Sequence, residues 1–292
     1  MKKIIIAGAT GYLGSYLVKE LQNRKATFKA IARNQKRLQE QGLKPEQIIK
    51  AEVTDPKTLS GKLHEADVVI STVGITRQKD GLTYMDVDFQ ANMNLLQEAK
   101  QAGVKKFIYV SVINGAKMRD LKIMEAKERF VDELKISGLD YQIIRPNGFF
   151  SDMKDFLDMA QKGKVYLFGG GNYKLNPIHG ADLAKAIVES IDVSENELII
   201  GGPDILTQNE IAEIALKTWM RPIKIVHLPD WIRKFVIRSM RLFTSSKTYG
   251  PIEFFLTMLG QDNVAPRHGV HRLQSFFVWE ADHLNNKQSH EK

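Results

Sequence analysis

The chain has 292 residues, 43% of them hydrophobic, which is enough to bury a sizeable core as one large or two coupled domains. It has no cysteine, which excludes disulfides, thiolate metal sites and cysteine nucleophiles and permits a reducing compartment. A formal charge of +8 favours acidic ligands or anionic surfaces. Because no zinc-finger spacing or RNA-recognition signature accompanies this charge, we expect no nucleic-acid partner.

The first apolar run follows Lys2 and Lys3 and superficially resembles a secretion signal. It is short, however, and passes straight into glycines, so residues 3–8 are predicted to form a strand buried on both faces of a parallel sheet. No window reaches the ~18 apolar residues that a membrane span needs. We therefore predict a soluble, cytoplasmic protein.

Three glycines follow this strand in the stretch "GATGYLG", with Gly8, Gly11 and Gly14 in a GxxGxxG spacing. A helical pattern follows, so the glycines lie between a strand and a helix. Glycines there let the chain turn tightly and approach a pyrophosphate, while helix N-terminal amides donate to the anion. The alternative is a structural loop without a ligand.

Arg33 ends the second predicted strand, "TFKAIAR", at residues 27–33. Many dinucleotide sites place an acidic residue there, which binds the ribose hydroxyls. A guanidinium suits a phosphate monoester instead, so the sequence favours NADP(H) over NAD(H), with Lys36 and Arg37 as helpers. The alternative is that Arg33 is a solvated loop cation.

The alternation of strands and helices continues to about residue 148. Further strands are predicted in "QIIKAEVTD", "ADVVISTVG", "KKFIYVSV" and "LDYQIIRP", with a long helix in residues 85–103. This order predicts an α/β fold with a doubly wound, Rossmann-like parallel sheet, whose ligands lie beyond the carboxyl ends of the strands. We assign residues 1–148 to a dinucleotide-binding domain and residues 149–292 to a smaller C-terminal cap or substrate region that partly returns to the main sheet.

Residues 231–243, "WIRKFVIRSMRLF", are predicted to form a basic amphipathic helix with Lys234, Arg238 and Arg241 on one arc. Packing on the sheet with solvated cations is the default interpretation. The alternatives are a cover over an apolar substrate and a peripheral contact with an anionic membrane. Farther on, His268 and His271 are three residues apart, but with no third ligand identifiable we predict no metal site.

Taken together, several segments resemble an atypical short-chain dehydrogenase/reductase, near the NmrA-like and divinyl-reductase-like branches. The resemblance extends over most of the chain. The matching segments are "GATGYLG", "VTDP" at 53–56, "STVG" at 71–74, "YVSV" at 109–112, "LDYQIIRPNGFF" at 139–150 and "HGADLAKAI" at 179–187.

The resemblance implies a set of cofactor contacts by matching position. The residues that would line the pyrophosphate are Gly8, Thr10, Gly11, Tyr12, Leu13 and Gly14. The other implied contacts are Asp55 with the adenine, Thr72, Val73 and Gly74 with the adenosine ribose, and Pro146 and Gly148 with the nicotinamide. Two alternatives stay open: Asp55 before Pro56 is only a helix cap, and "STVG" is only a strand terminus.

In active members of this family, a tyrosine four residues before a lysine usually transfers the proton. Here Lys127 matches the lysine, whereas Ile123 replaces the tyrosine and cannot transfer a proton. The resemblance favours Lys127 as a contact to the nicotinamide ribose, and it acts as an acid or base if a dry pocket lowers its pKa. Ser111 matches the family's hydroxyl position and either orients a substrate carbonyl or caps the following segment.

The sequence and the resemblance together predict an NADPH-dependent reductase that acts on a small apolar or quinone-like substrate without the tyrosine proton relay. The alternative is a non-catalytic NADP(H)-binding redox sensor or assembly factor that reports to a protein partner. A third interpretation, an interaction protein with an empty glycine loop, leaves the coincidence of so many cofactor-site segments unexplained.

Overall fold

The computed structural model of the chain describes residues 2–76, 78 and 81–290. The chain divides into two compact units, each assembled from segments that are distant in sequence. Unit 1 comprises Met1–Arg145, Leu183–Ile199 and Ser246–Pro251. Unit 2 comprises Pro146–Asp182, Ile200–Ser245 and Ile252–Lys292.

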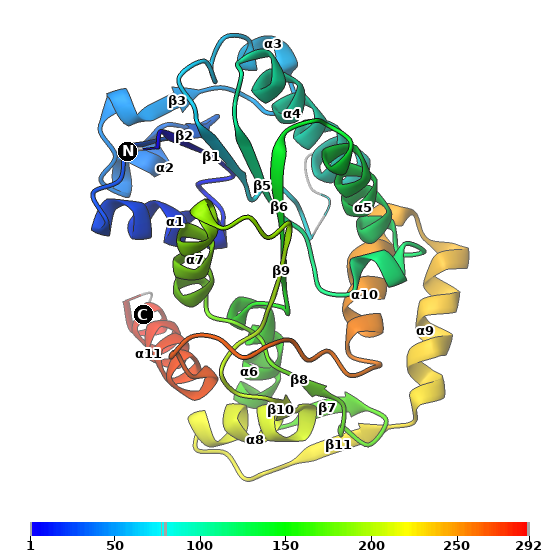
Figure 1. Cartoon of the computed structure of the whole chain (residues 1–292). Coiled ribbons are helices and arrows are strands. Elements are labelled where there is room, and N and C mark those ends of the chain that lie inside the picture. The colour runs from blue at the N-terminus through cyan, green and yellow to red at the C-terminus, as the bar shows by residue number, and fades with distance from the viewer. Residues whose placement is uncertain (1, 77, 79–80, 291–292) are drawn as a thin grey trace. The chain divides into compact units, whose positions relative to one another are not determined.

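Within the described residues, unit 1 is built on a seven-stranded sheet in the order β3-β2-β1-β4-β5-β6-β9 (Figure 1). The strands are β1 (Ile4–Ala7), β2 (Phe28–Ala32), β3 (Ile48–Lys50), β4 (Val68–Ser71), β5 (Lys106–Val110), β6 (Asp140–Pro146) and β9 (Glu197–Ile200). The first six strands pair in parallel. β9 runs in the same direction, because the amide of Ile143 donates to Asn196 and that of Asn147 donates to Ile200. The predicted doubly wound α/β fold is confirmed.

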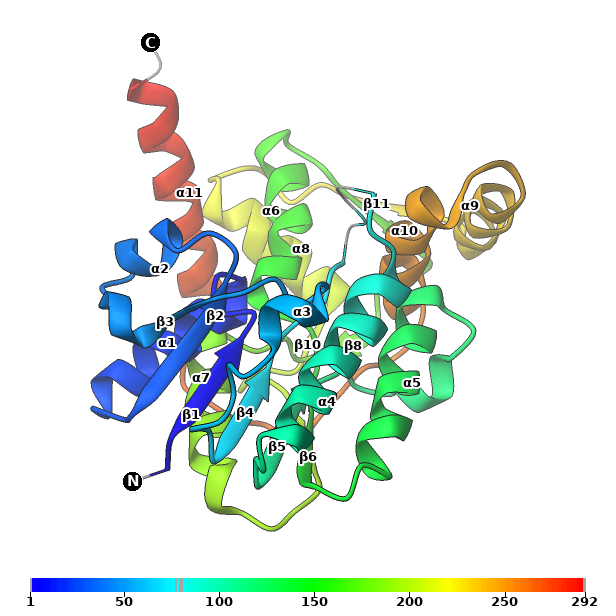
Figure 2. The same ribbon diagram turned by 90° about the horizontal axis from the view of Figure 1, so that it is seen from above.

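Helices cover both faces of this sheet, which explains why every residue of β1, β4 and β5 is buried and most are apolar. Figures 1 and 2 show α4 and α5 on one face and α1 and α7 on the other. The helices of this unit are α1 (Tyr12–Asn23), α2 (Lys36–Glu40), α3 (Pro56–Leu59), α4 (Asn92–Gln101), α5 (Lys122–Lys135) and most of α7 (Gly180–Glu189). Shorter helices are η1 (Pro45–Gln47), the π-helix η2 (Met85–Ala91) directly before α4, η3 (Gly115–Met118) and η5 (Ser190–Asp192).

One core cluster of unit 1 lies between the sheet and the helices α4 and α5. Phe107 and Tyr109 of β5 are fully buried there against Phe130 of α5. The Tyr109 and Phe130 rings meet edge to face, with centroids 4.6 Å apart. Aromatic pairs in this arrangement contribute about 0.5–1.5 kcal/mol beyond their buried area. This packing fixes α5, and with it Lys127, against the sheet.

Unit 2 is mostly helical, with two short strand pairs. Strands β8 (Lys174–Leu175) and β10 (Leu206–Thr207) pair antiparallel, and β7 (Val165–Phe168) and β11 (Ile225–Leu228) pair in parallel. The helices are η4 (Phe150–Met153), α6 (Lys154–Gln161), α8 (Gln208–Thr218), α9 (Asp230–Phe243), the end of α10 (Ser246–Met258) and α11 (Leu273–His290). Phe156, Leu216 and Phe277 form a buried cluster that joins α6, α8 and α11. None of the helices described in either unit combines the length and hydropathy that crossing a membrane requires.

Candidate functional site

The glycine loop joins β1 to α1 in a turn that only glycine fits. Gly8 has a φ of 85°, and a Cβ there would lie 2.5 Å from Oγ1 of Thr72. A Cβ at Gly14 would overlap the Gly8 carbonyl oxygen, and the amide of Gly11 donates to that oxygen at 3.0 Å. The start of α1 is thereby held against the end of the strand. Its first-turn amides have no acceptors within the helix, which suits them to an anion such as a pyrophosphate.

Side chains of the loop divide between surface and core. Thr10 is exposed and Tyr12 is half-buried, whereas Leu13 is buried in the core. A contact between Leu13 and a pyrophosphate therefore requires its backbone amide rather than its side chain. The contacts of this loop with a cofactor stay predictions.

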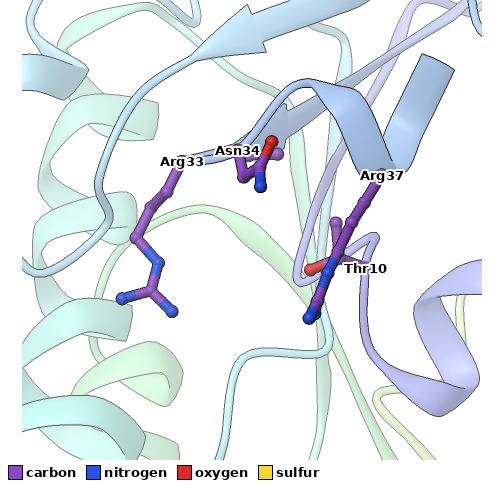
Figure 3. Close-up of a pocket in the computed structure, with 5 residues that line it drawn as sticks. Thr10, Arg33, Asn34 and Arg37 are labelled. Atoms are coloured by element: carbon purple, nitrogen blue, oxygen red, sulfur yellow. The ribbon is translucent and has the colours of Figure 1, made fainter. Parts of the chain in front are cut away.

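A pocket of about 430 Å³ opens beside the loop, where β2 ends. The residues that line it are Thr10, Ala32, Arg33, Asn34 and Arg37. Figure 3 shows the guanidinium groups of Arg33 and Arg37 extending in the same direction from either side of Asn34. The Asn34 carboxamide oxygen accepts from the amide of Lys36 at 3.0 Å and so fixes the approach to α2. Lys36 itself is not among the lining residues.

The charge of this pocket is positive. Arg33 is exposed and its Nε lies 3.3 Å from Oε2 of Glu52, which follows β3. Exposed pairs of this kind contribute about 0–1 kcal/mol. Within the described part of the chain, Arg37 has no acidic partner. Two guanidinium groups against one carboxylate leave the pocket able to pair with a phosphate monoester.

The ends of β3 and β4 carry the other implied adenosine contacts. Asp55 caps α3, and its Oδ1 accepts from the amide of Lys57 at 3.0 Å, as the helix-cap alternative predicts. Thr72 donates its amide to Ala7 at 3.0 Å, which places it beside Gly8 at the neighbouring strand end. The amide of Val73 donates to the Ser71 hydroxyl at 3.3 Å.

Lys127 is held in a buried ion pair. Its Nζ lies 2.8 Å from Oδ1 of Asp88, and the two side chains are 10% and 0% exposed. The other carboxylate oxygen of Asp88 accepts from the amide of Ile75 at 3.2 Å. A Cβ at Gly74 would lie 2.6 Å from the carboxylate and 2.8 Å from the ammonium. The pair therefore packs directly beneath the segment that the family resemblance assigns to the adenosine ribose.

Burial and Asp88 act in opposite directions on Lys127. Burial lowers the pKa of its ammonium, but the neighbouring carboxylate outweighs this effect and the pKa is raised above its ordinary value. Burial also raises the pKa of the Asp88 carboxyl, even beside the ammonium. The surroundings of Lys127 thus favour its ammonium form, rather than the lowered pKa on which we made a role as an acid or base depend.

Ile123 and Ser111 complete the region around Lys127. Ile123 is buried one turn earlier in α5 and serves as core packing. Ser111 is also buried, and its hydroxyl donates to Oε1 of Glu128 at 3.0 Å. Arg145 contacts both, with Nη1 2.6 Å from the same Glu128 oxygen and 3.3 Å from the Ser111 hydroxyl. Because the hydroxyl is engaged within the protein, its role toward a substrate stays a prediction.

The remaining predicted residues lie in unit 2. Pro146 is buried at the end of β6, and Gly148 has a φ of 55°. His271 points to Asp182, with Nδ1 2.8 Å from Oδ1, and it stacks on His179 at 4.2 Å between ring centroids. In the described residues, no group of three or more His, Asp or Glu side chains is arranged to hold a metal ion.

Asp88 and Asn92 were missed by the sequence reasoning. Asp88 neutralises Lys127, and the side chain of Asn92 accepts from the Ser71 hydroxyl at 2.5 Å. The signal that could have found them is a run of core-facing positions, namely Tyr84, Val87, Asp88, Ala91, Asn92 and Leu95. Polar residues that interrupt an apolar stripe must find partners inside the protein.

Sequence comparison places these features in a family. Residues 8–193 match a family model described as NAD(P)H-binding. The chloroplastic divinyl chlorophyllide a 8-vinyl-reductase of Zea mays is 30% identical over 255 residues, which cover 80% of this chain and 63% of the relative. This chain thus spans less than two thirds of that relative. Photosystem II assembly factor Ycf39 of Synechocystis is 25% identical over 250 residues, or 83% of this chain and 74% of the relative.

A solved structure shows the same fold over almost the whole chain. The NADPH-dependent quinone oxidoreductase QOR2 of Escherichia coli, complexed with NADPH, has a TM-score of 0.70 and 17% identity, and covers 96% of this chain and 99% of that chain. The family match spans the glycine loop, the Arg33 pocket and the Lys127 pair. The chain therefore belongs to the NAD(P)H-binding family of atypical short-chain dehydrogenases/reductases.

Proposed function

We propose that the protein is an NADPH-dependent reductase of a small apolar or quinone-like substrate. The observation that carries the cofactor preference is the pocket after β2, where Arg33 and Arg37 line a space of about 430 Å³. In a Rossmann-like site, the ribose 2′ position lies near the end of this strand. A 2′-phosphate there would meet two guanidinium groups, whereas NAD(H) has no anion to pair with them.

The glycine loop fits the rest of the dinucleotide. Gly8, Gly11 and Gly14 keep the backbone free of side chains at the start of α1, so the helix amides can reach the pyrophosphate. Lys127, beneath Gly74, would hold the nicotinamide ribose through protons that it does not share with Asp88. The bound cofactor would supply a hydride, while the chain binds and orients the reactants.

The proposed class of substrate rests on the absence of a proton-transferring tyrosine from α5. Ile123 provides no proton, and Lys127 is held as an ammonium by Asp88. A conjugated apolar acceptor suits such a site, because it takes a hydride and then a proton from solvent without a tyrosine relay. The names of two relatives, a vinyl-reductase and a quinone oxidoreductase, describe acceptors of this kind.

Titration with reduced cofactors tests the pocket. We expect NADPH to bind at least about tenfold more tightly than NADH, because a charge-assisted pair contributes about 1.5–3 kcal/mol. The Arg33→Gln, Arg37→Gln double variant should lose the preference. Lys36→Gln, which removes a nearby cation outside the pocket lining, should keep it. Equal affinities in the unaltered protein would refute the assignment.

Turnover is tested separately with a panel of quinones under multiple-turnover conditions. We expect steady oxidation of NADPH with at least one quinone. The Arg33→Gln, Arg37→Gln variant should lose rate at low NADPH and recover it at saturating cofactor, because its change is confined to binding. NADPH binding without oxidation by any acceptor would refute the reductase and retain the cofactor site.

The second candidate is a non-catalytic NADP(H) sensor or assembly factor. It is favoured by Ile123, which stands where the family's proton-transferring tyrosine would be and cannot transfer a proton, and by Lys127, which the buried Asp88 holds in place. The relative Ycf39 is named an assembly factor. Affinity capture from a lysate, with and without NADPH, would distinguish this function if the captured set of proteins changes with the cofactor while no acceptor is reduced.

A further inference from the structure

Helix α9, Asp230–Phe243, has apolar side chains on two opposite faces. One face carries Ile232, Val236, Ile237 and Met240, all half-buried within the protein. The other carries Trp231, Phe235 and Leu242, which are 65%, 62% and 73% exposed. A helix that only packs on its own protein needs one apolar face, so the second one requires an explanation.

The half-buried face of α9, which we call the inner face, is held against α10 by two arginine side chains. Arg233 is buried, with Nε 2.7 Å from Oδ1 of Asp230 and Nη1 3.1 Å from the Leu256 carbonyl oxygen of α10. Arg241 of α9 pairs with Glu253 of α10. Figure 1 shows α9 alongside α10. These contacts fix the rotation of α9 about its axis, so the exposure of the opposite face is a consequence of how the helix is held.

The exposed face of α9, which we call the outer face, carries a row of apolar side chains beside a row of basic ones. Trp231, Phe235 and Leu242 are spaced by four and seven residues and so fall on one line along the helix. Lys234 and Arg238 lie on the adjoining arc, and both are exposed. Phe243, the last residue of the helix, lies off this row and is 84% exposed. Asp230 is the helix's only acidic residue, and its Oδ2 lies 3.2 Å from Nζ of Lys234, whose side chain is 72% exposed.

We propose that α9 lies flat in the interface of an anionic membrane. Tryptophan and phenylalanine insert at the level between headgroups and acyl chains, while adjoining lysine and arginine side chains pair with lipid phosphates. The charge of the basic row is complementary to an anionic bilayer, which favours that surface over a neutral one. Because no described helix is suited to crossing a membrane, the contact is peripheral. This proposal does not depend on the reductase activity.

Flotation of the full chain with lipid vesicles tests the proposal. We expect binding to phosphatidylcholine vesicles that contain phosphatidylglycerol, at least tenfold weaker binding to phosphatidylcholine alone, and release at high salt. Vesicles that carry a brominated lipid should quench Trp231, and the quenching should fall in Trp231→Phe while vesicle binding persists. No binding to anionic vesicles at low salt, or equal binding to both vesicle types, would overturn the proposal.

Matched variants distinguish insertion of α9 into the membrane from nonspecific binding of vesicles by other exposed side chains. The Trp231→Ser, Phe235→Ser, Leu242→Ser variant should lose at least tenfold in vesicle affinity, whereas Ile136→Ser, Val270→Ser, which removes exposed apolar side chains elsewhere, should not. Lys234→Gln, Arg238→Gln should bind more weakly and with a shallower salt dependence than Lys162→Gln, Lys224→Gln, which removes two exposed cations outside α9. NADPH affinity should be unchanged in every α9 variant, which shows that they fold. Equal losses in the α9 and control variants would refute the assignment.

Discussion

Two cationic sites in unit 1 were predicted to contact the same cofactor, and they differ in almost every physical respect. Arg33 is 65% exposed and its partner Glu52 is loosely placed at 3.3 Å. Lys127 is 10% exposed and its partner Asp88 is completely buried at 2.8 Å. The first cation can exchange its partner for a phosphate at little cost. The second must keep its carboxylate, because a buried charge left without a partner is strongly destabilising.

The contrast separates two tasks that the family resemblance assigns to one ligand. We expect the exposed guanidinium of Arg33 to select among cofactors, because the free energy of its interactions changes mainly when an anion binds. The buried ammonium of Lys127, paired with Asp88, affects the free energy of unfolding whether or not a cofactor is present. We therefore expect variants at Asp88 and Lys127 to change the stability of the protein, and variants at Arg33 and Glu52 to change its affinity.

The largest expected effect is that of Asp88→Asn. It leaves the Lys127 ammonium buried without a carboxylate, which should lower the free energy of unfolding by about 3–5 kcal/mol. Urea denaturation followed by circular dichroism measures this loss. The Asp88→Leu, Lys127→Met double variant removes both charges and should recover most of it. A loss below about 1 kcal/mol in Asp88→Asn would show that the pair is as weak as a surface pair.

Alkaline pH should act on the same pair. Because the pKa of Lys127 is raised in the folded state, its contribution is complete below the unfolded-state pKa of about 10.4 and is lost as the pH rises above it. The free energy of unfolding should fall by up to about 1.4 kcal/mol per pH unit there, relative to the Asp88→Leu, Lys127→Met variant. Denaturation at several pH values measures the difference. Parallel curves for the two proteins would contradict the raised pKa.

Removal of Lys127 alone should have a smaller effect on the cofactor. Lys127→Met would remove the hydrogen bond that we propose to the nicotinamide ribose, so NADPH affinity should fall by about two- to tenfold, or 0.5–1.5 kcal/mol. Ile123→Ala, one turn away, should disturb packing and leave the affinity nearly unchanged. Normal NADPH binding together with lost turnover in Lys127→Met would instead identify the lysine as the catalyst.

The smallest expected effect belongs to Glu52. Glu52→Gln frees Arg33 from its carboxylate, so NADPH should bind up to about fivefold more tightly, as expected from a pair of about 0.2–1 kcal/mol. NADH affinity should not change. The gain should disappear in an Arg33→Gln background. A gain that survives there would assign the effect to the overall charge of the protein.

The sequence predicted the fold and the glycine loop because both depend on local patterns. Apolar runs that stop at Gly8 and Gly74 mark strand ends, and parallel sheets bring such ends to one edge. Arg33 was identifiable for the same reason, since it directly follows a strand. The Lys127 pair was not, because its partner is distant in sequence and on another helix, and a helical pattern does not specify which neighbouring helix it faces.

The helix in residues 231–243 shows a second limit of prediction from sequence, namely which face of a helix turns inward. Its existence was predicted and is confirmed by α9. Packing on the sheet was the default interpretation, and this helix has apolar residues on both faces, so a helical wheel cannot say which face turns inward. The contact of buried Arg233 with the Leu256 carbonyl oxygen determines which face turns inward, and the spacing of apolar residues in the sequence does not reveal this tertiary interaction.

The π-helix η2, Met85–Ala91, makes the Lys127 pair depend on the length of the chain. A π-turn accommodates an extra residue in an otherwise α-helical segment, as a single insertion would produce. Deletion of one residue between Asp88 and Asn92 would restore an α-helix into α4 and rotate Asp88 by about 100° about the axis. The carboxylate would then leave Lys127, although no charged residue had been changed. Homologues with a shorter segment here would have to neutralise this lysine by other means.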